Sequence, residues 1–580
     1  MKQKYLATAL LAGLLTLSSC GEDFLYISPQ GSIDQAALEN EIGVELLVTN
    51  TYGVLTATEW GASLWNWAQG GMYGGDANKG SDPGDQSVLN EMELYNTMPT
   101  NGYLSEKWSV TFRGVRRANL ALQVLEKAED MDAAKKSARK GELIFLRCLM
   151  YFESLKVFGP YFPYMDETVI ENDPKLYNDR DIYGDVIADL DVAINLLPNT
   201  PENVGRAYKW AAIGLKAKML MQQGKMSEAK PLLSNLLSSG TTASGKAFAL
   251  SNDVNQNWDS FADNTSPESI FEIQYSSDNN NVGNSSLALC YPHNSGPGGC
   301  CGFYQPSFEL ANSFQVTAEG LPYLNGEYRT KPTVSKKVDS EEYATNDNSI
   351  AVDPRIDIAM GRYHIPYKDW GMPATDWIRN PVNGGIFLPK KHVFTKAMFD
   401  AGLGKKGQHD GWAPGSAMNI EYLSVRDAML LYAECLANDG ELSAAMEQVN
   451  KIRARAALDV NITKLDDGTP AANYKISEYP SSHAAFSNKD VCISAIRMER
   501  KLELAMEGQR FFDLARWGGD YMAQELHAYV DYERQYIPKF AGASKLSSAR
   551  TMFPVPDGQI QTMGNDDSGK PYLVQPAPWR

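Results

Sequence analysis

Two segments far apart in the chain share one spacing of small residues, and this pattern restricts the fold more than any other feature. Residues 217–229 begin and end with alanine and place Gly224 after six intervening residues and before four. Residues 433–445 repeat both intervals around Gly440. Apolar residues recur at three- and four-residue steps on either side of each glycine, which predicts two antiparallel helices joined at a helix stop. Small residues at these positions let such helices approach closely, as in the tetratricopeptide unit, so the sequence predicts an all-α scaffold of helical hairpins.

Helical periodicity continues outside the two hairpins, and two long tracts interrupt it. Further helices are expected at 105–128, 134–158, 180–197 and 491–516. The two tracts are rich in Gly, Asn, Asp, Pro and aromatic residues, and loops this long usually carry function. Because no low-complexity linker divides the chain, we expect residues 20–580 to form one domain. Its helical scaffold would comprise about 20–57, 105–239 and 421–580, and a large loop-rich ligand-binding subdomain would comprise about 58–104 and 240–420.

The N-terminus carries a secretory signal. Lys2 and Lys4 precede an apolar run over residues 5–17 that is too short to remain as a membrane-spanning helix. The run ends in Leu-Ser-Ser-Cys, which is similar to a bacterial lipobox, in which Cys20 becomes the lipidated first residue after residues 1–19 are removed. The alternative is an ordinary cleaved signal with a chance cysteine. No other segment approaches 18 continuous apolar residues, so a lipid on Cys20 is the expected membrane anchor.

The charge balance and the absence of several motifs exclude broad classes of function. The chain has 54 Lys and Arg against 71 Asp and Glu, a net charge of -17, so it would repel a phosphate backbone and no nucleic-acid partner is expected. It lacks a P-loop, a dinucleotide-binding glycine motif, a GxSxG elbow and an HExxH motif. We therefore predict no catalytic residues, no cofactor and no metal. A glycosidase remains the alternative among enzymes, because it needs only a pair of carboxylates.

Of seven cysteines, Cys20 is taken by lipid and six remain in a compartment that permits disulfides. Three of these lie in helical patterns, where we expect small buried apolar residues: Cys148, Cys435 and Cys492. Cys290, Cys300 and Cys301 lie in a loop rich in Gly, Pro and Asn with room for one bridge, either a loop closure from Cys290 or a vicinal pair at 300–301. Zinc is the weaker interpretation, because no CxxC or spaced histidine pair accompanies them.

Aromatic residues gather beside polar groups at three places in the loop-rich tracts. The first group is Trp60, Trp65, Trp67 and Tyr73, the second is Tyr291, Phe303 and Tyr304, and the third is Tyr363, Tyr367, Trp370 and Trp377. Sugars present flat C–H faces that stack on aromatic rings and hydroxyls that need polar partners, so this composition favours glycan recognition. The alternative is that most of these rings pack the loops against the scaffold.

Several motifs along the chain resemble those of one family, the SusD/RagB-like outer-membrane lipoproteins of Bacteroidetes. They include the lipobox at Cys20, the Gly75-Asp76-Ala77 segment, the Asp353-Pro354-Arg355 turn and the closing Phe553-Pro554-Val555-Pro556. The strongest is the segment 496–518, in which acids and bases alternate at helix spacing beside apolar residues. Paired charges at this spacing would tie helices together around a packed seam, so these motifs identify the scaffold and not the ligand site.

The resemblance implies a SusD-like protein whose tetratricopeptide-like hairpins carry an irregular ligand-binding face. It further implies a non-catalytic lipoprotein that captures oligo- or polysaccharide and delivers it to a SusC-like TonB-dependent transporter of the outer membrane. Glu22 and Asp23, just after Cys20, resemble the surface-export signal of Bacteroidetes lipoproteins, which favours a cell-surface location. Two alternatives stay open, capture of peptides by the same type of uptake system and a surface glycosidase.

Ligand residues in this family tend to be loop aromatics and nearby polar groups, not a fixed motif. The resemblance therefore points to seven ligand-binding positions: Trp65, Trp67, Tyr73, Asp76, Tyr291, Tyr304 and Trp370. The family often has two acids where this chain has Gly75 and Asp76. The alternative for Asp76 is therefore a structural hydrogen-bond acceptor in a turn.

Overall fold

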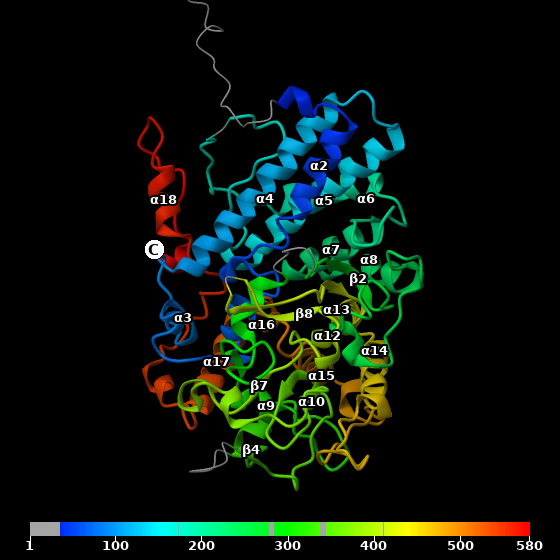
Figure 1. Cartoon of the computed structure of the whole chain (residues 1–580), viewed down its shortest axis with the longest axis vertical. Coiled ribbons are helices and arrows are strands. Elements are labelled where there is room, and N and C mark those ends of the chain that lie inside the picture. Colours follow the sequence, from blue (N-terminus) through cyan, green and yellow to red (C-terminus); the bar gives the residue numbers. More distant parts are fainter. Residues whose placement is uncertain (1–34, 172, 278–282, 337–343, 410) are drawn as a thin grey trace, which may run out of the picture.

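The computed structural model describes residues 35–171, 173–277, 283–336, 344–409 and 411–580. Cys20 and the predicted signal segment lie outside the described residues. Long helices form the upper part and one side of the molecule, and irregular segments fill much of the lower part (Figure 1). Helices hold 47% of the residues and strands 9%, which confirms the predicted all-α class.

The longer helices carry the scaffold. They are α2 (Glu41–Tyr52), α4 (Gly102–Lys127), α5 (Ala133–Phe158), α6 (Tyr183–Leu196), α7 (Lys209–Gln222), α8 (Met226–Ser239), α13 (Val425–Asn438), α14 (Leu442–Ala456), α15 (Lys489–Glu503), α16 (Arg510–Arg516), α17 (Gly519–Glu533) and α18 (Asp557–Met563). The short helices are α3 (Val88–Glu93), α9 (Phe308–Ser313), α10 (Ile356–Ala359), α11 (Pro381–Gly384) and α12 (Lys396–Asp400). The strands are β1 (Ala77–Gly80), β2 (Ser269–Ile273), β3 (Phe303–Pro306), β4 (Ser335–Lys336), β5 (Thr345–Asn346), β6 (Met360–Gly361), β7 (Leu388–Pro389), β8 (Gly404–His409), β9 (Ala413–Ser416) and β10 (Ile420–Ser424).

Both predicted hairpins are present, as α7–α8 and α13–α14, and they pack side by side (Figure 1). Gly224 and Gly440 turn the chain between the helices with φ values of +71° and +84°, a backbone region that favours glycine. The alanines at both ends of each spacing are fully buried: Ala217, Ala229, Ala433 and Ala445. Lys218 of α7 and Asp427 of α13 form a 2.8 Å ion pair between the hairpins, so the long segment between them in sequence does not separate them in space.

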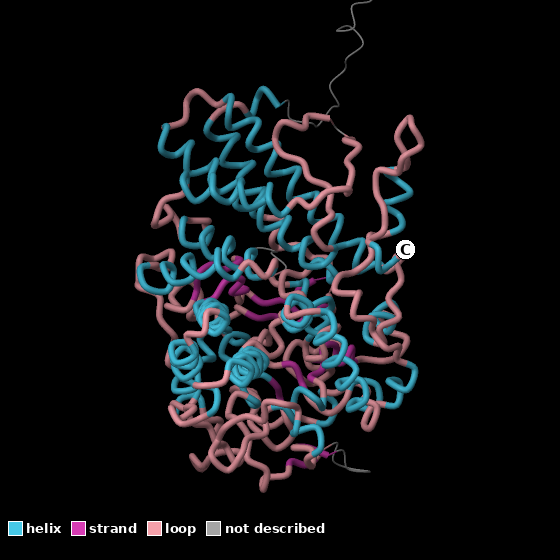
Figure 2. The backbone as a smooth tube through the Cα atoms, turned by 180° about the vertical axis from the view of Figure 1, so that it is seen from behind, coloured by secondary structure: helices cyan, strands magenta, loops and turns pink. Residues whose placement is uncertain are grey.

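Pairs of strands tie the loop-rich tracts to the scaffold and to each other. β2 and β10 are antiparallel, with Ile273 opposite Ile420, so the chain leaves and rejoins the scaffold at one place. β1 and β3 are also antiparallel, with Ala77 opposite Pro306, and this pair joins the two tracts. Figure 2 shows most of the strands in the middle of the molecule, below the long helices at the top, and one short pair at the lower end. The two tracts therefore form one continuous face.

Buried ion pairs form the seam that the charged motifs predict. Arg355 of the loop-rich tract pairs with Glu499 (2.6 Å) and Glu503 (2.9 Å) on α15. Arg455 of α14 pairs with Glu503 (2.5 Å) and with Glu268 (2.7 Å). Burial alone would raise the pKa of Glu503, but the charges of Arg455 and Arg355 outweigh it and hold that pKa at about 2. The predicted structural role of these motifs is confirmed.

The predicted helix over 491–516 is wrong in one respect, because a turn at 504–509 divides it into α15 and α16. Met506 and Gly508 take positive φ values of +66° and +68° in this turn. A Cβ at Gly508 would lie 1.8 Å from the carbonyl oxygen of Trp65. The turn between α15 and α16 therefore packs directly against the backbone of the loop that carries Trp65.

The structure chooses between the two disulfide alternatives. Cys300 and Cys301 form the vicinal pair, while Cys290 is buried with a free thiol. Cys148, Cys435 and Cys492 are buried and free, as predicted. Within the described ranges, no helix is long and apolar enough to cross a membrane. No group of three or more metal-ligating side chains is found in that part of the chain either.

Candidate functional site

The structure buries six of the seven residues to which the resemblance points. Their exposed fractions are 5% for Trp65, 0% for Trp67, 2% for Tyr73, 2% for Asp76, 1% for Tyr291 and 0% for Tyr304. Trp370 is half-buried. The five aromatic side chains of this set are enclosed by protein, so in this structure they do not form an exposed platform on which a sugar could stack.

Four of the predicted rings do come together, as part of the core. Trp65, Tyr291 and Tyr304 surround His392, with ring centroids 5.8, 5.8 and 6.3 Å from its ring. Trp67 meets Tyr304 edge to face at 6.0 Å. Burial lowers the pKa of His392 to about 4, so this ring is neutral at physiological pH. These contacts bind the first aromatic loop to the cysteine loop of the second tract.

The glycines of the first loop serve the same packing. A Cβ at Gly71 would lie 1.9 Å from the hydroxyl oxygen of Tyr304. A Cβ at Gly70 would lie 1.8 Å from the carbonyl oxygen of Gly508. The glycines are required because the loop backbone touches its neighbours.

Asp76, Tyr73 and Trp370 have separate structural roles. Asp76 Oδ2 accepts a hydrogen bond from the Met506 N–H at 3.1 Å, and burial raises the pKa of Asp76 to about 7. Tyr73 packs edge to face on Phe511 at 4.8 Å. The indole N–H of Trp370 donates to a backbone carbonyl. Asp76 is therefore the structural acceptor that stood as the alternative to a ligand role.

Two other tryptophans form an aromatic pair at the surface. Trp60 and Trp412 meet edge to face, with centroids 6.1 Å apart and an interplanar angle of 72°. Trp412 is 42% exposed and Trp60 is half-buried. Glu59, which precedes Trp60 in the chain, forms a 2.7 Å ion pair with Arg113 of α4. This surface, the Trp60–Trp412 pair, combines ring faces with charged hydrogen-bonding groups.

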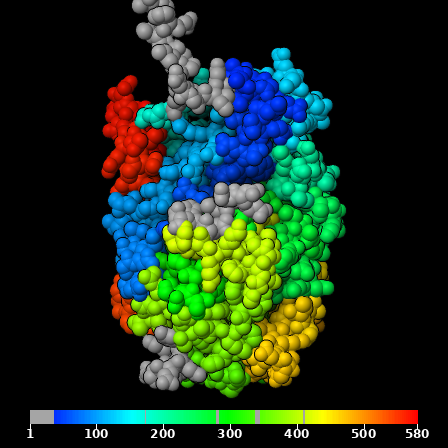
Figure 3. Space-filling model, viewed as in Figure 1, coloured from blue at the N-terminus to red at the C-terminus, as the bar shows by residue number. Residues whose placement is uncertain are grey.

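Local structure explains why Trp412 is exposed and Trp60 is partly exposed. Trp60 begins the 3-10 helix η3 (Trp60–Ala62), which packs on α4 at the edge of the scaffold. Trp412 lies in the turn of the β8–β9 hairpin. Figure 3 shows the segment around residues 350–420, in yellow-green, covering much of the lower front face of the molecule. The sequence Asp-Gly before Trp412 is typical of a hairpin turn. This signal, which would have predicted a tryptophan in a turn, was not used in the sequence analysis.

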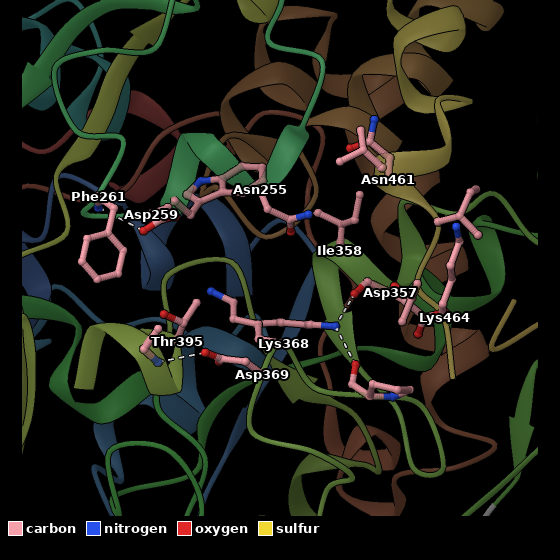
Figure 4. Close-up of a pocket in the computed structure, with 17 residues that line it drawn as sticks. Asn255, Asp259, Phe261, Asp357, Ile358, Lys368, Asp369, Thr395, Asn461 and Lys464 are labelled. Atoms are coloured by element: carbon pink, nitrogen blue, oxygen red, sulfur yellow. Dashed lines mark hydrogen bonds between the residues drawn. The ribbon is translucent and has the colours of Figure 1, made fainter. Parts of the chain in front are cut away.

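A cavity of about 450 Å³ opens within the loop-rich part of the molecule. Its walls come from η5 (Val254–Trp258) and the loop after it, from 357–369, from the start of α12 and from 460–464. Figure 4 shows Phe261 at one end and Asn461 and Lys464 at the other, with Lys368 and Asp369 between them. Phe261 is 57% exposed. The cavity thus offers an accessible ring beside amino, carboxylate and amide groups.

Comparisons with known proteins agree with this architecture. Residues 267–575, more than half of the chain, match the model described as the SusD family. The chain belongs to the SusD family. Residues 24–221 also match a model described as starch-binding associating with outer membrane. SusD proteins are outer-membrane-associated, non-catalytic glycan-binding proteins, so the resemblance read from the motifs is confirmed.

Individual SusD proteins align along almost their whole length. SusD-like protein P38 of Formosa agariphila is 23% identical over 518 residues, covering 87% of this chain and 90% of that protein. A SusD superfamily protein from Bacteroides vulgatus superposes with a TM-score of 0.66 at 19% identity, covering 93% of this chain and 99% of the other. Surface glycan-binding protein A from Bacteroides thetaiotaomicron, solved in complex with laminarihexaose, gives a TM-score of 0.60 at 18% identity, covering 92% and 99%. At these identities the structural likeness shows a shared fold.

Proposed function

We propose that this SusD-family protein is a cell-surface lipoprotein, anchored to the outer membrane through Cys20, that captures oligo- or polysaccharide. It then delivers the glycan to a SusC-like TonB-dependent transporter. The observation that carries the proposal is the exposed Trp60–Trp412 pair on the loop-rich side of a SusD fold. The laminarihexaose bound by the relative from Bacteroides thetaiotaomicron supports a glucan as the first ligand to test.

The chemistry of the Trp60–Trp412 pair suits a sugar chain. Two indole rings at 72° to each other present two differently oriented apolar surfaces to consecutive sugar units. Glu59 can accept and Arg113 can donate hydrogen bonds to hydroxyls at the edge of the rings. An open surface of this kind buries little ligand, so we expect modest affinity for each sugar unit.

Native affinity electrophoresis tests the binding step. The mature, lipid-free protein is run through gels that contain laminarin and other plant, fungal and host polysaccharides, and liberated reducing sugar is assayed in parallel. We expect retardation by one glycan class without release of product. Replacing Trp60 and Trp412 together by Ala should weaken this retardation about tenfold or more.

A matched control separates ring stacking from a general loss of apolar surface. Tyr161 is an exposed ring outside the Trp60–Trp412 pair, 55% accessible, so Tyr161→Ala should keep the wild-type mobility in the same gels. Retardation that survives the double tryptophan variant would remove the Trp60–Trp412 pair from the site. Absence of retardation by any glycan, with retention of peptides instead, would overturn glycan capture.

A second experiment tests whether the protein delivers the glycan to a transporter. Mild detergent extraction of the outer membrane should co-purify the protein with a TonB-dependent transporter, and a Cys20→Ala variant should leave the membrane fraction. Uptake of the cognate glycan should fall when the protein is deleted. Unchanged uptake in that strain would contradict the delivery step.

A further inference from the structure

The cavity of Figure 4 contains two buried amino groups whose charges are not paired. Lys368 Nζ donates to the backbone carbonyls of Lys391 and Val393, and Lys390 Nζ donates to those of Asp357 and Pro366. Among the described residues, neither amine forms an ion pair with a carboxylate. Burial lowers the pKa of Lys368 to about 7 and that of Lys390 to about 8, which shows that the surrounding acids do not compensate for the lost hydration.

Carboxylates share the same cavity but point to other partners. Asp369 accepts hydrogen bonds from the backbone N–H groups of Lys396 (2.6 Å) and Ala397 (2.8 Å) at the start of α12. Asp259 accepts one from the Phe261 N–H at 3.0 Å. The negative charges of Asp259 and Asp369 act on Lys368 from beyond ion-pair distance. Donors and acceptors therefore face a common space without satisfying one another.

This mixture of amines and carboxylates disfavours a ligand that carries a net charge. An anionic sugar would meet the carboxylates of Asp259 and Asp369, and a cationic sugar would meet the amines of Lys368 and Lys390. A hydroxyl both accepts and donates, so neighbouring hydroxyls of a neutral sugar can bridge an amine and a carboxylate. A neutral polyol therefore satisfies both kinds of group at once.

The apolar part of the cavity fits the same ligand. Phe261 is 57% exposed and Val460 is 53% exposed, and both line the cavity. A pyranose can place its C–H face on the ring of Phe261 while its hydroxyls reach inward. The volume of about 450 Å³ lies in the range of small-molecule pockets and is too small for a long chain.

We propose that this cavity is a second carbohydrate site, which binds a short neutral saccharide such as the end of a glycan chain. The proposal rests on the proposed glycan-binding function and adds the class of sugar and a separate place for it. α12 begins in the wall of the cavity and contacts β8, the strand that leads to Trp412. A polysaccharide held at both places would gain avidity over a short fragment.

Isothermal titration with hexasaccharides, prepared from the polysaccharide that retards the wild-type protein, tests this proposal. Phe261→Ala should weaken hexasaccharide binding about tenfold or more, because it removes the stacking surface. Tyr161→Ala is the matched control, since Tyr161 is a ring of similar exposure (55%) outside the cavity lining. Adding Phe261→Ala to the Trp60→Ala/Trp412→Ala protein should weaken whatever hexasaccharide binding that protein retains, whereas adding Tyr161→Ala should not. Hexamers of galacturonic acid and glucosamine should bind more weakly than the neutral ones.

A second variant covers a possible loss of structure. Lys368→Met keeps the length of the side chain and removes the donor, so it should weaken binding of the neutral hexasaccharide while thermal unfolding reports whether the fold survives. Wild-type affinity in Phe261→Ala and in a folded Lys368→Met would overturn the cavity proposal and leave glycan capture at the Trp60–Trp412 pair intact. No binding of any glycan by the wild-type protein would instead overturn the proposed function itself.

Discussion

The first aromatic loop and the β8–β9 hairpin have similar composition and opposite environments. Both place tryptophan beside glycine, yet Trp67 is fully buried and Trp412 is 42% exposed. A Cβ at Gly70 would lie 1.8 Å from a backbone oxygen, whereas a Cβ at Gly411 would have no atom within 4 Å. Glycine serves close packing in the loop and turn formation in the hairpin. Aromatic and glycine content therefore does not distinguish a core from a binding surface, whereas the neighbouring elements do.

The largest loss of stability should follow removal of the buried negative charge that holds the first aromatic loop. Glu153 is fully buried and accepts hydrogen bonds from Lys107 Nζ (2.6 Å) and Tyr422 Oη (2.6 Å), as well as from Asn66 of the loop. Burial alone would raise the pKa of Glu153, but Lys107 and Lys156 hold it well below its usual range. Glu153→Gln leaves buried amines without their counter-charge and should cost about 3–5 kcal/mol, measured by urea unfolding. A loss below about 1 kcal/mol would show that this loop is not held by the scaffold.

Truncation of a buried ring should cost nearly as much. Trp67 contacts Tyr103, Phe303 and Tyr304 edge to face. Trp67→Ala should lower the free energy of unfolding by about 3–5 kcal/mol, because the cavity cannot collapse fully among rigid rings. Glycan retention by the fraction that remains folded should be unchanged. Selective loss of retention at full stability would return Trp67 to the binding site.

The buried acid of the loop, Asp76, gives an effect of similar size that depends on pH and vanishes at low pH. Burial raises the pKa of Asp76 to about 7, from 3.8. Between these values the folded protein keeps a proton that the unfolded chain has lost, so this group's contribution to stability falls as pH rises through the window. Asp76→Asn removes the titration and keeps an acceptor for Met506. The variant should gain about 4 kcal/mol relative to wild type between pH 4 and pH 8, about 1.4 kcal/mol for each unit of the pKa shift, measured by chemical denaturation at both values. A difference that does not change with pH would contradict the raised pKa.

Removal of the exposed Trp412 ring should have the smallest effect on stability. Trp412→Ala alone should change the free energy of unfolding by less than about 0.5 kcal/mol, because the ring has few neighbours. The same variant should nevertheless reduce glycan retention in affinity gels. A large loss of stability would mean that the hairpin ring is part of the packing, as the rings of the first loop are.

Local and repetitive features of the sequence were sufficient to predict the helical hairpins of the scaffold. The spacing around Gly224 and Gly440 predicted both hairpins, because helix periodicity and a positive φ at a helix stop are properties of a few consecutive residues. The charged segment 496–518 predicted a structural seam for a similar reason, since residues three and four apart share one helix face. The family followed from the same motifs.

Contacts between distant segments determined the features that the sequence did not predict. The indole N–H of Trp65 donates to the carbonyl of Met506, 441 positions away, and no local pattern announces that bond. It is part of the packing that buries the first loop and divides the predicted helix at 504–509. Contacts between distant segments also determined which cysteines form the disulfide and how exposed Trp412 is. Sequence by itself determined the two helical hairpins and the family to which the chain belongs. Tertiary packing alone decided which rings are core and which face solvent, because burial depends on neighbours brought together only by folding.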